Sequence, residues 1–202
     1  MSPVSNVQFS RFTESEVGKL FTFGGKGALE VVWPASDDER RDLEAHLKEV
    51  FGVSLAIQVK ARHVLVRRNR ASQLWIRFDE KKERLVSDPL FWYFFGYMDL
   101  AAMAFQAPIF LVPSAVVHAQ ADPRAHGDRV RFTFAASMDP RSRDQWRPYA
   151  LPAGRGGRPG DPDSSGAFPA GSPAGRPAPN HGARCGGRAL GRPPGCVTSV
   201  SR

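Results

Sequence analysis

Apolar and polar residues alternate along much of the chain in the way that is typical of β-strands. The clearest alternation covers residues 55–61, where the odd-numbered positions are apolar and Gln58 and Lys60 lie on the other face. Runs that are alternating or almost wholly apolar predict further strands over residues 28–33, 74–78, 90–97, 109–112 and 130–135.

Helical spacing is present in two other segments. Thr13 followed by Glu16 resembles a helix N-cap with a Glu at the third helical position, and apolar residues then recur at helical spacing up to Gly24. A short helix is predicted over residues 114–120. One helix followed mostly by strands predicts an α/β or α+β sheet with helical cover.

Residues 36–51 fit both a helix and a strand. A Ser and a Glu three residues apart form a capping-box pattern, and apolar residues follow at helical spacing. Residues 42–47 also alternate between polar and apolar, and a hairpin turning near residues 49–52 would pair position i with about 100 minus i. That register would place Asp42 opposite Gln58. The residues by themselves leave both interpretations open.

The residues from 153 onward differ in composition from the rest of the chain. They contain 12 Gly, 8 Pro and 7 Arg, and Phe168 is their only aromatic residue. Ordering them would cost roughly 1 to 2 kcal/mol per residue in backbone entropy, which so few apolar side chains cannot offset. We therefore predict a folded domain over residues 1–152 and a disordered tail over residues 153–202. The tail has the composition that a GC-rich gene yields in a shifted frame or past its normal end.

The positive charge of the chain is concentrated in this tail. The sequence has 28 Lys and Arg against 20 Asp and Glu, a net charge of +8, to which the tail's 7 Arg and 2 Asp contribute +5. The predicted domain is left with about +3, so only the placement of its basic residues can indicate a nucleic-acid partner.

The positions of the cysteines and the lengths of the apolar runs indicate the cellular compartment of the protein. Cys185 and Cys196 both lie in the tail, which leaves the domain without a disulfide or a thiolate metal site. The N-terminus lacks the apolar core of a signal peptide, and polar residues and Pro108 interrupt the apolar run over residues 89–113. We predict a cytoplasmic protein without a membrane segment. The sequence does not indicate an oligomeric state.

Gln58 and Lys60 are the residues that first suggest chemistry. They lie two residues apart on one face of a strand, and a buried lysine needs a charged partner, which Asp42 would supply across the hairpin. A carboxylate, an amide carbonyl and an ammonium group together suit a divalent cation and a phosphate, with Glu16 completing the group. The alternative is an edge strand with Lys60 facing water, and Asp42 and Glu16 as ordinary helix charges.

These residues give the chain a resemblance to the PD-(D/E)xK nuclease superfamily. Glu16 on an opening helix, Asp42, and then Gln58-Val59-Lys60 resemble the branch that has Asp…Gln-x-Lys in place of Asp…Glu-x-Lys. The resemblance covers about residues 12–149. It implies an α/β fold with a mixed central sheet flanked by helices (restriction-endonuclease-like), and it favours a strand over residues 41–48.

The resemblance also implies roles for the four residues. Asp42 would be the principal ligand of Mg²⁺ or Mn²⁺, Gln58 the second ligand, Lys60 the stabiliser of the attacking water, and Glu16 an outer support. Gln58 stands where many members have a carboxylate, and a neutral amide oxygen binds a divalent cation more weakly. The implied function is either hydrolysis of DNA phosphodiesters or a catalytically inactive nucleic-acid-binding or protein-interaction module of the same fold.

Four arginines follow Lys60 and are candidates for binding the nucleic-acid backbone. If the strand continued, Arg62 and Arg68 would share the face of Lys60 and Arg67 would point away; in the alternative, Arg67, Arg68 and Arg70 lie in a solvated loop. Farther along, Trp146 is expected to anchor the chain in the core rather than to stack on a base.

Overall fold

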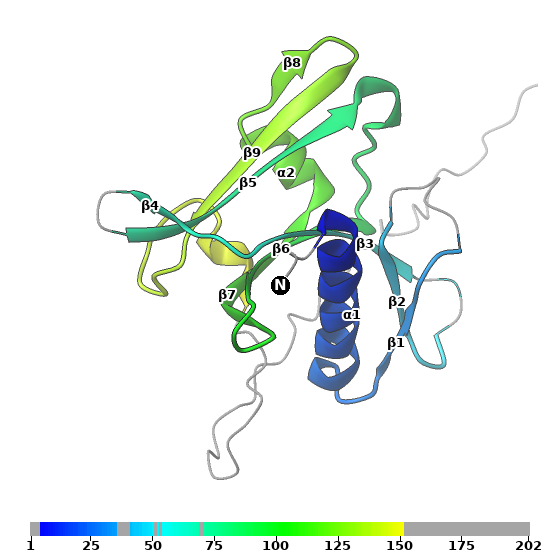
Figure 1. Ribbon diagram of the computed structural model, residues 1–202. Helices are drawn as coiled ribbons and strands as arrows, with labels where there is room; N and C mark the ends of the chain where they lie inside the picture. Colours follow the sequence, from blue (N-terminus) through cyan, green and yellow to red (C-terminus); the bar gives the residue numbers. More distant parts are fainter. Residues whose placement is uncertain (1–4, 36–40, 51, 53, 69–70, 152–202) are drawn as a thin grey trace, which may run out of the picture. The chain divides into compact units, whose positions relative to one another are not determined.

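Strands dominate the computed structural model, which describes residues 5–35, 41–50, 52, 54–68 and 71–151 (Figure 1). These residues belong to one compact unit of the chain. The predicted tail lies outside them. A six-stranded sheet has the order β1-β2-β3-β6-β7-β10 and a four-stranded sheet the order β4-β5-β9-β8. The strands are β1 Leu29–Val32, β2 Leu43–Leu47, β3 Ser54–Arg62, β4 Val66–Arg68, β5 Ala71–Lys81, β6 Phe91–Asp99, β7 Ala104–Pro113, β8 Arg124–His126, β9 Arg129–Ser137 and β10 Ala150–Leu151.

The six-stranded sheet is mixed, which confirms the predicted fold class. β3 runs parallel to β6, whereas the other neighbours in this sheet are antiparallel. β3 lies between β2 and β6, so the alternative of an edge strand for Lys60 is wrong. The β6–β7 register shifts between Phe95 and Tyr97. A Cβ on the intervening Gly96 would lie 2.6 Å from the Phe105 ring, so a glycine is required at this close approach.

The helix α1 (Asn6–Gly24) covers one face of this sheet. Its N-cap is Ser5, whose hydroxyl accepts a hydrogen bond from the Gln8 N–H at 3.2 Å while the Gln8 side chain accepts from the Ser5 N–H. The N-cap predicted at Thr13 is therefore wrong: Thr13 is inside the helix, and its hydroxyl donates to a backbone carbonyl. Figure 1 shows α1 beside β1, β2 and β3. The buried cluster on this face contains Val17, Phe21, Leu43, Ala45, Ile57 and Val59.

The four-stranded sheet packs on the opposite face. Phe95 of β6 and Phe134 of β9 stack with their ring centroids 3.9 Å apart. Trp146 belongs to the same buried cluster and is 1% exposed, which confirms its expected place in the core. The predicted short helix is present as α2 (Ser114–Gln120), which contacts β6 and β7. The main cover on this side is therefore a second sheet, where the sequence had predicted helices.

The long apolar run over residues 89–113 forms β6 and β7, as expected of buried strands rather than of a membrane segment. Among the described residues, no helix is both long enough and apolar enough to span a membrane. Two short 3-10 turns, Lys82–Arg84 and Arg147–Tyr149, complete the secondary structure described.

Candidate metal and nucleic-acid site

The segment that fitted both a helix and a strand forms the strand β2, paired with β3. Leu43 lies opposite Ile57 and His46 opposite Ser54, which is the register predicted for the hairpin. Burial explains why the strand is formed, because it places Leu43 and Ala45 in the cluster under α1. Residues 36–40, at the start of the ambiguous segment, lie outside the described residues.

Asp42 lies directly before β2, and the hairpin register places it opposite Gln58. Its backbone N–H donates to the Ile57 carbonyl oxygen at 2.9 Å. One oxygen of its carboxylate, Oδ2, accepts a hydrogen bond from the Val59 N–H at 2.6 Å. The carboxylate is thus held against β3 by a backbone donor.

Gln58 is buried, at 7% exposure, and its carbonyl oxygen Oε1 has no hydrogen-bond partner among the described residues. Its neighbour in the β6 register is Tyr93. Buried polar atoms are nearly always paired, and an unpaired acceptor costs about 1 to 3 kcal/mol. The lone pairs of this oxygen are thus unused, and the atom itself has almost no solvent-accessible surface.

Lys60 lies two residues farther along β3, on the same face as Gln58. Its Nζ is 3.8 Å from Oε1 of Glu80, a β5 residue that is only 4% exposed. The ammonium also lies 5.2 Å from the centroid of the Phe78 ring. The carboxylate that pairs with Lys60 in the structure therefore belongs to the second sheet, whereas the sequence had pointed to Asp42 as its charged partner. One feature of the sequence could have identified Glu80 as this partner. It is a lone carboxylate among the apolar residues on the buried face of β5, in line with Leu74 and Ile76.

The donor set of this group fits a weakly held divalent cation. Among the described residues no group of three or more His, Cys, Asp and Glu side chains could hold a metal ion. The nearby carboxylate of Glu44 is already paired, with Arg41 at 2.5 Å and with His46 at 3.3 Å. Asp42 and Gln58 supply two oxygens, and Mg²⁺ is commonly bound by one or two protein carboxylates, with water and substrate phosphate completing its shell.

Glu16 is not brought into this group by any contact the structure shows. Its carboxylate pairs with Lys19, one turn farther along α1, at 2.6 Å. α1 covers the face of β3 that carries Ile57 and Val59, and Gln58 and Lys60 lie on the other face.

The arginines after Lys60 are divided between the two sheets. β3 ends at Arg62, and the chain then crosses to β4, where Arg67 and Arg68 are exposed. The strand thus does not continue from Lys60 to Arg68, because the chain leaves the first sheet at His63, and the alternative of a loop is wrong for Arg67 and Arg68, which lie on β4. The His63 ring packs edge-on against Phe9 of α1 with their centroids 5.0 Å apart. Arg70 lies outside the described residues.

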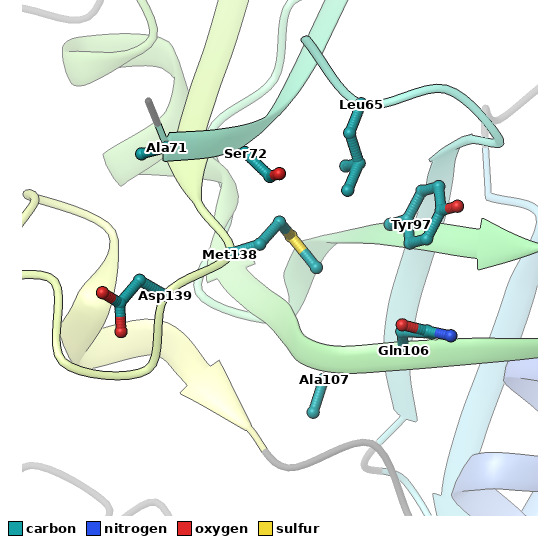
Figure 2. Close-up of a pocket in the computed structure, with 8 residues that line it drawn as sticks. All are labelled: Leu65, Ala71, Ser72, Tyr97, Gln106, Ala107, Met138 and Asp139. Atoms are coloured by element: carbon teal, nitrogen blue, oxygen red, sulfur yellow. The ribbon is translucent and has the colours of Figure 1, made fainter. Parts of the chain in front are cut away.

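A hollow of about 450 Å³ lies elsewhere, between the ends of β5, β6, β7 and β9 (Figure 2). Two of its polar side chains are engaged: the Gln106 amide donates to Asp99 at 2.6 Å, and Asp139 accepts from the Arg141 N–H. That hydrogen bond is the main cause of the lowered pKa of Asp139. The hollow shares no residue with the Asp42, Gln58 and Lys60 group, and it is lined by Leu65, Ala71, Ser72, Tyr97, Gln106, Ala107, Met138 and Asp139.

Comparison with known proteins finds a distant likeness among solved structures. No family model and no curated protein matches the chain. Among solved structures, the bacterial homing endonuclease I-Ssp6803I is 16% identical, with a TM-score of 0.41, over 73% of this chain and 89% of that one. At this identity and TM-score, the likeness is too distant to assign a function to this chain.

Proposed function

We propose that the protein is a metal-dependent nuclease that hydrolyses phosphodiester bonds in DNA, with Asp42 and Gln58 as the ligands of Mg²⁺ or Mn²⁺. The observation that supports this proposal is the buried Gln58 carbonyl oxygen. It has no hydrogen-bond partner among the described residues, and the hairpin register extended by one position sets Gln58 across from Asp42, whose carboxylate accepts from the neighbouring Val59 N–H. Proteins retain such a destabilising feature chiefly at functional sites.

Each residue of the proposed site would have its own role in phosphodiester hydrolysis. A bound Mg²⁺ would supply Lewis-acid stabilisation of the phosphoryl group. The Lys60 ammonium, on the same strand face as Gln58, would stabilise the negative charge that gathers on the phosphate during attack by water. Arg62, Arg67 and Arg68 would contact flanking phosphates. The supporting role of Glu16 remains a prediction from the family resemblance.

The second candidate is a catalytically inactive binding module of the same fold. Two observations favour it. Gln58 provides a neutral oxygen where a carboxylate would bind a cation more strongly, and Lys60 already has Glu80 as a charged partner.

Calorimetric titration of Mg²⁺ and Mn²⁺ into the full chain separates the two candidates. Asp42→Asn is the variant of choice, because its amide oxygen can still accept from the Val59 N–H while the charge is lost. We expect wild type to bind the cation weakly, Asp42→Asn to lose binding, and Gln58→Glu to bind more tightly and to cleave DNA at a lower Mg²⁺ concentration. Lys48→Gln, an exposed change in the β2–β3 turn, is the control and should match wild type.

Two results would contradict the nuclease proposal. One is identical binding isotherms for wild type and Asp42→Asn. The other is wild type and Gln58→Glu both failing to cleave single-stranded and double-stranded DNA and RNA with either cation, which would leave the binding module.

A further inference from the structure

The outer face of the four-stranded sheet is strongly cationic. Along β5 and β9 the buried residues alternate with others, and the buried ones, such as Leu74 and Phe134, pack against the first sheet. The alternate positions therefore point away from the core. Four of these outward positions carry a cation, namely Arg77, Lys81, Arg129 and Arg131, and the flanking strands add Arg68 of β4 and Arg124 of β8 on the same face.

These cations face one another across neighbouring strands. Lys81 lies directly opposite Arg129, and Arg131 lies directly opposite Arg124. Like charges in directly opposed positions destabilise a sheet. The fold thus carries an arrangement that weakens it and that a polyanion would relieve.

Few carboxylates offset this charge. Asp79 is the only acidic residue at the outward strand positions that the structure describes, and Arg131 binds it through two hydrogen bonds of 2.7 and 2.8 Å. Those bonds are the main cause of the lowered pKa of Asp79.

At the ends of the strands, Asp122 pairs with Arg124 and Glu83 pairs with Lys81. Arg77 and Arg129 are exposed, and neither has a carboxylate within ion-pair distance in the described part of the chain. These two arginines are therefore available to an external anion.

We propose that this face, centred on the β5–β9 ribbon, binds double-stranded DNA. The ribbon has nine paired positions, from Gln73 opposite Ser137 to Lys81 opposite Arg129, and Figure 1 shows the two strands side by side. At about 3.3 Å per residue it spans roughly 30 Å, with β4 beside one end and β8 beside the other, and several DNA-binding proteins place β-sheet strands in a groove of the duplex.

The side chains on the face favour duplex DNA over other nucleic acids. Binding of single strands relies on several stacked aromatic side chains, and Trp75 is the only aromatic residue at the outward positions of β5 and β9. The deep, narrow major groove of A-form RNA does not admit a ribbon. Arg, Gln and Thr side chains at these positions match the phosphates and base edges of DNA.

This inference rests on the proposed function only in that the partner is nucleic acid, and it does not need the cation site. Gln58 and Lys60 face the inner side of β5, where Lys60 meets Glu80, whereas Arg77 and Arg129 lie on the outer side. DNA binding in EDTA can therefore be measured separately from metal binding and cleavage.

The test is the fluorescence anisotropy of a labelled DNA duplex with the full chain in EDTA, over a series of salt concentrations. The double variant Arg77→Gln and Arg129→Gln is compared with Arg11→Gln and Arg143→Gln, which remove the same charge from exposed positions elsewhere. Losing two phosphate contacts should lower the log–log salt slope by about 1.8 and weaken binding on the order of 10-fold to 100-fold near 0.1 M salt, while the control retains wild-type values.

Several results would overturn the inference. Equal weakening in both double variants would assign binding to overall charge or to the arginines of residues 153–202. Tighter binding of a single strand or an RNA duplex would exclude duplex DNA as the preferred partner. Face variants that bind and cleave DNA like wild type would remove this inference and leave the proposed nuclease. A wild-type chain that binds no DNA would remove both, with cation binding at Asp42 still measurable by titration.

Discussion

At the scale of single residues, Gln58 combines burial with an unused hydrogen-bonding atom. Its side chain is 7% exposed, and its carbonyl oxygen has no partner among the described residues. A core position selected for stability alone would carry an apolar side chain of similar length, because removing an unpaired buried acceptor is neutral or stabilising. Under the proposed function, binding of a cation to this oxygen would compensate for that cost in stability.

Gln58→Met tests this trade-off, because methionine has a similar length and no amide. We expect the free energy of unfolding to rise by about 1 kcal/mol, measured by urea denaturation at neutral pH without divalent cations. The same variant should lose the cation binding seen by calorimetry. A loss of 2 kcal/mol or more would mean that the amide has a structural role.

At the scale of secondary-structure elements, His118 joins α2 to the strand β6 and the segment before it. Its Nε2 lies 3.0 Å from the Tyr93 hydroxyl, and its Nδ1 lies 2.8 Å from the hydroxyl of Ser87. A neutral imidazole has one donor and one acceptor, which suits two hydroxyl partners. Burial lowers the pKa of His118, because the surroundings of the ring disfavour its charged form.

Stability should therefore decrease as the pH falls through the ordinary histidine range. With its pKa lowered in the folded state, His118 binds more protons in the unfolded chain, so the free energy of unfolding rises with pH up to about 6.5 and then levels off. Thermal melts between pH 5.5 and 7.5 would measure this dependence. In His118→Gln, which cannot titrate, the slope should be markedly smaller. An unchanged slope would assign the dependence to other groups.

At the scale of the whole molecule, the Lys60–Glu80 ion pair joins the two sheets. Lys60 lies on β3 of the first sheet and Glu80 on β5 of the second, with 3.8 Å between Nζ and Oε1. Glu80 is 4% exposed, whereas the Lys60 side chain is 22% exposed. Removing the lysine would leave a buried carboxylate with less compensation, at a cost that partial exposure of the pair reduces.

A double-mutant cycle would measure this connection. We expect Lys60→Met to lower the free energy of unfolding by on the order of 2 kcal/mol, below the range of fully buried pairs. Lys60→Met combined with Glu80→Gln should be less destabilised than the sum of the single changes, as measured by urea denaturation. Additive effects would show that the two side chains do not stabilise the packing of the sheets together.

What the sequence determined by itself is largely local. Period-two alternation predicted β3, β5 and β9, and almost wholly apolar runs predicted β6 and β7, which are buried on both faces. The register of the β2–β3 hairpin followed from the same alternation and the position of its turn, and it placed Asp42 opposite Gln58. The choice of strand over helix in that segment needed the family resemblance, because the local residue pattern fits both.

The tertiary structure decided which faces meet. No local pattern indicated that a second sheet would cover β3 and β6, that the chain would leave the first sheet at His63, or that Glu80 would be the charged partner of Lys60. The cationic outer face is also a tertiary feature, since it unites residues from four strands. Such contacts join residues far apart in the chain, and they depend on the burial of whole faces rather than on the periodicity of any one segment.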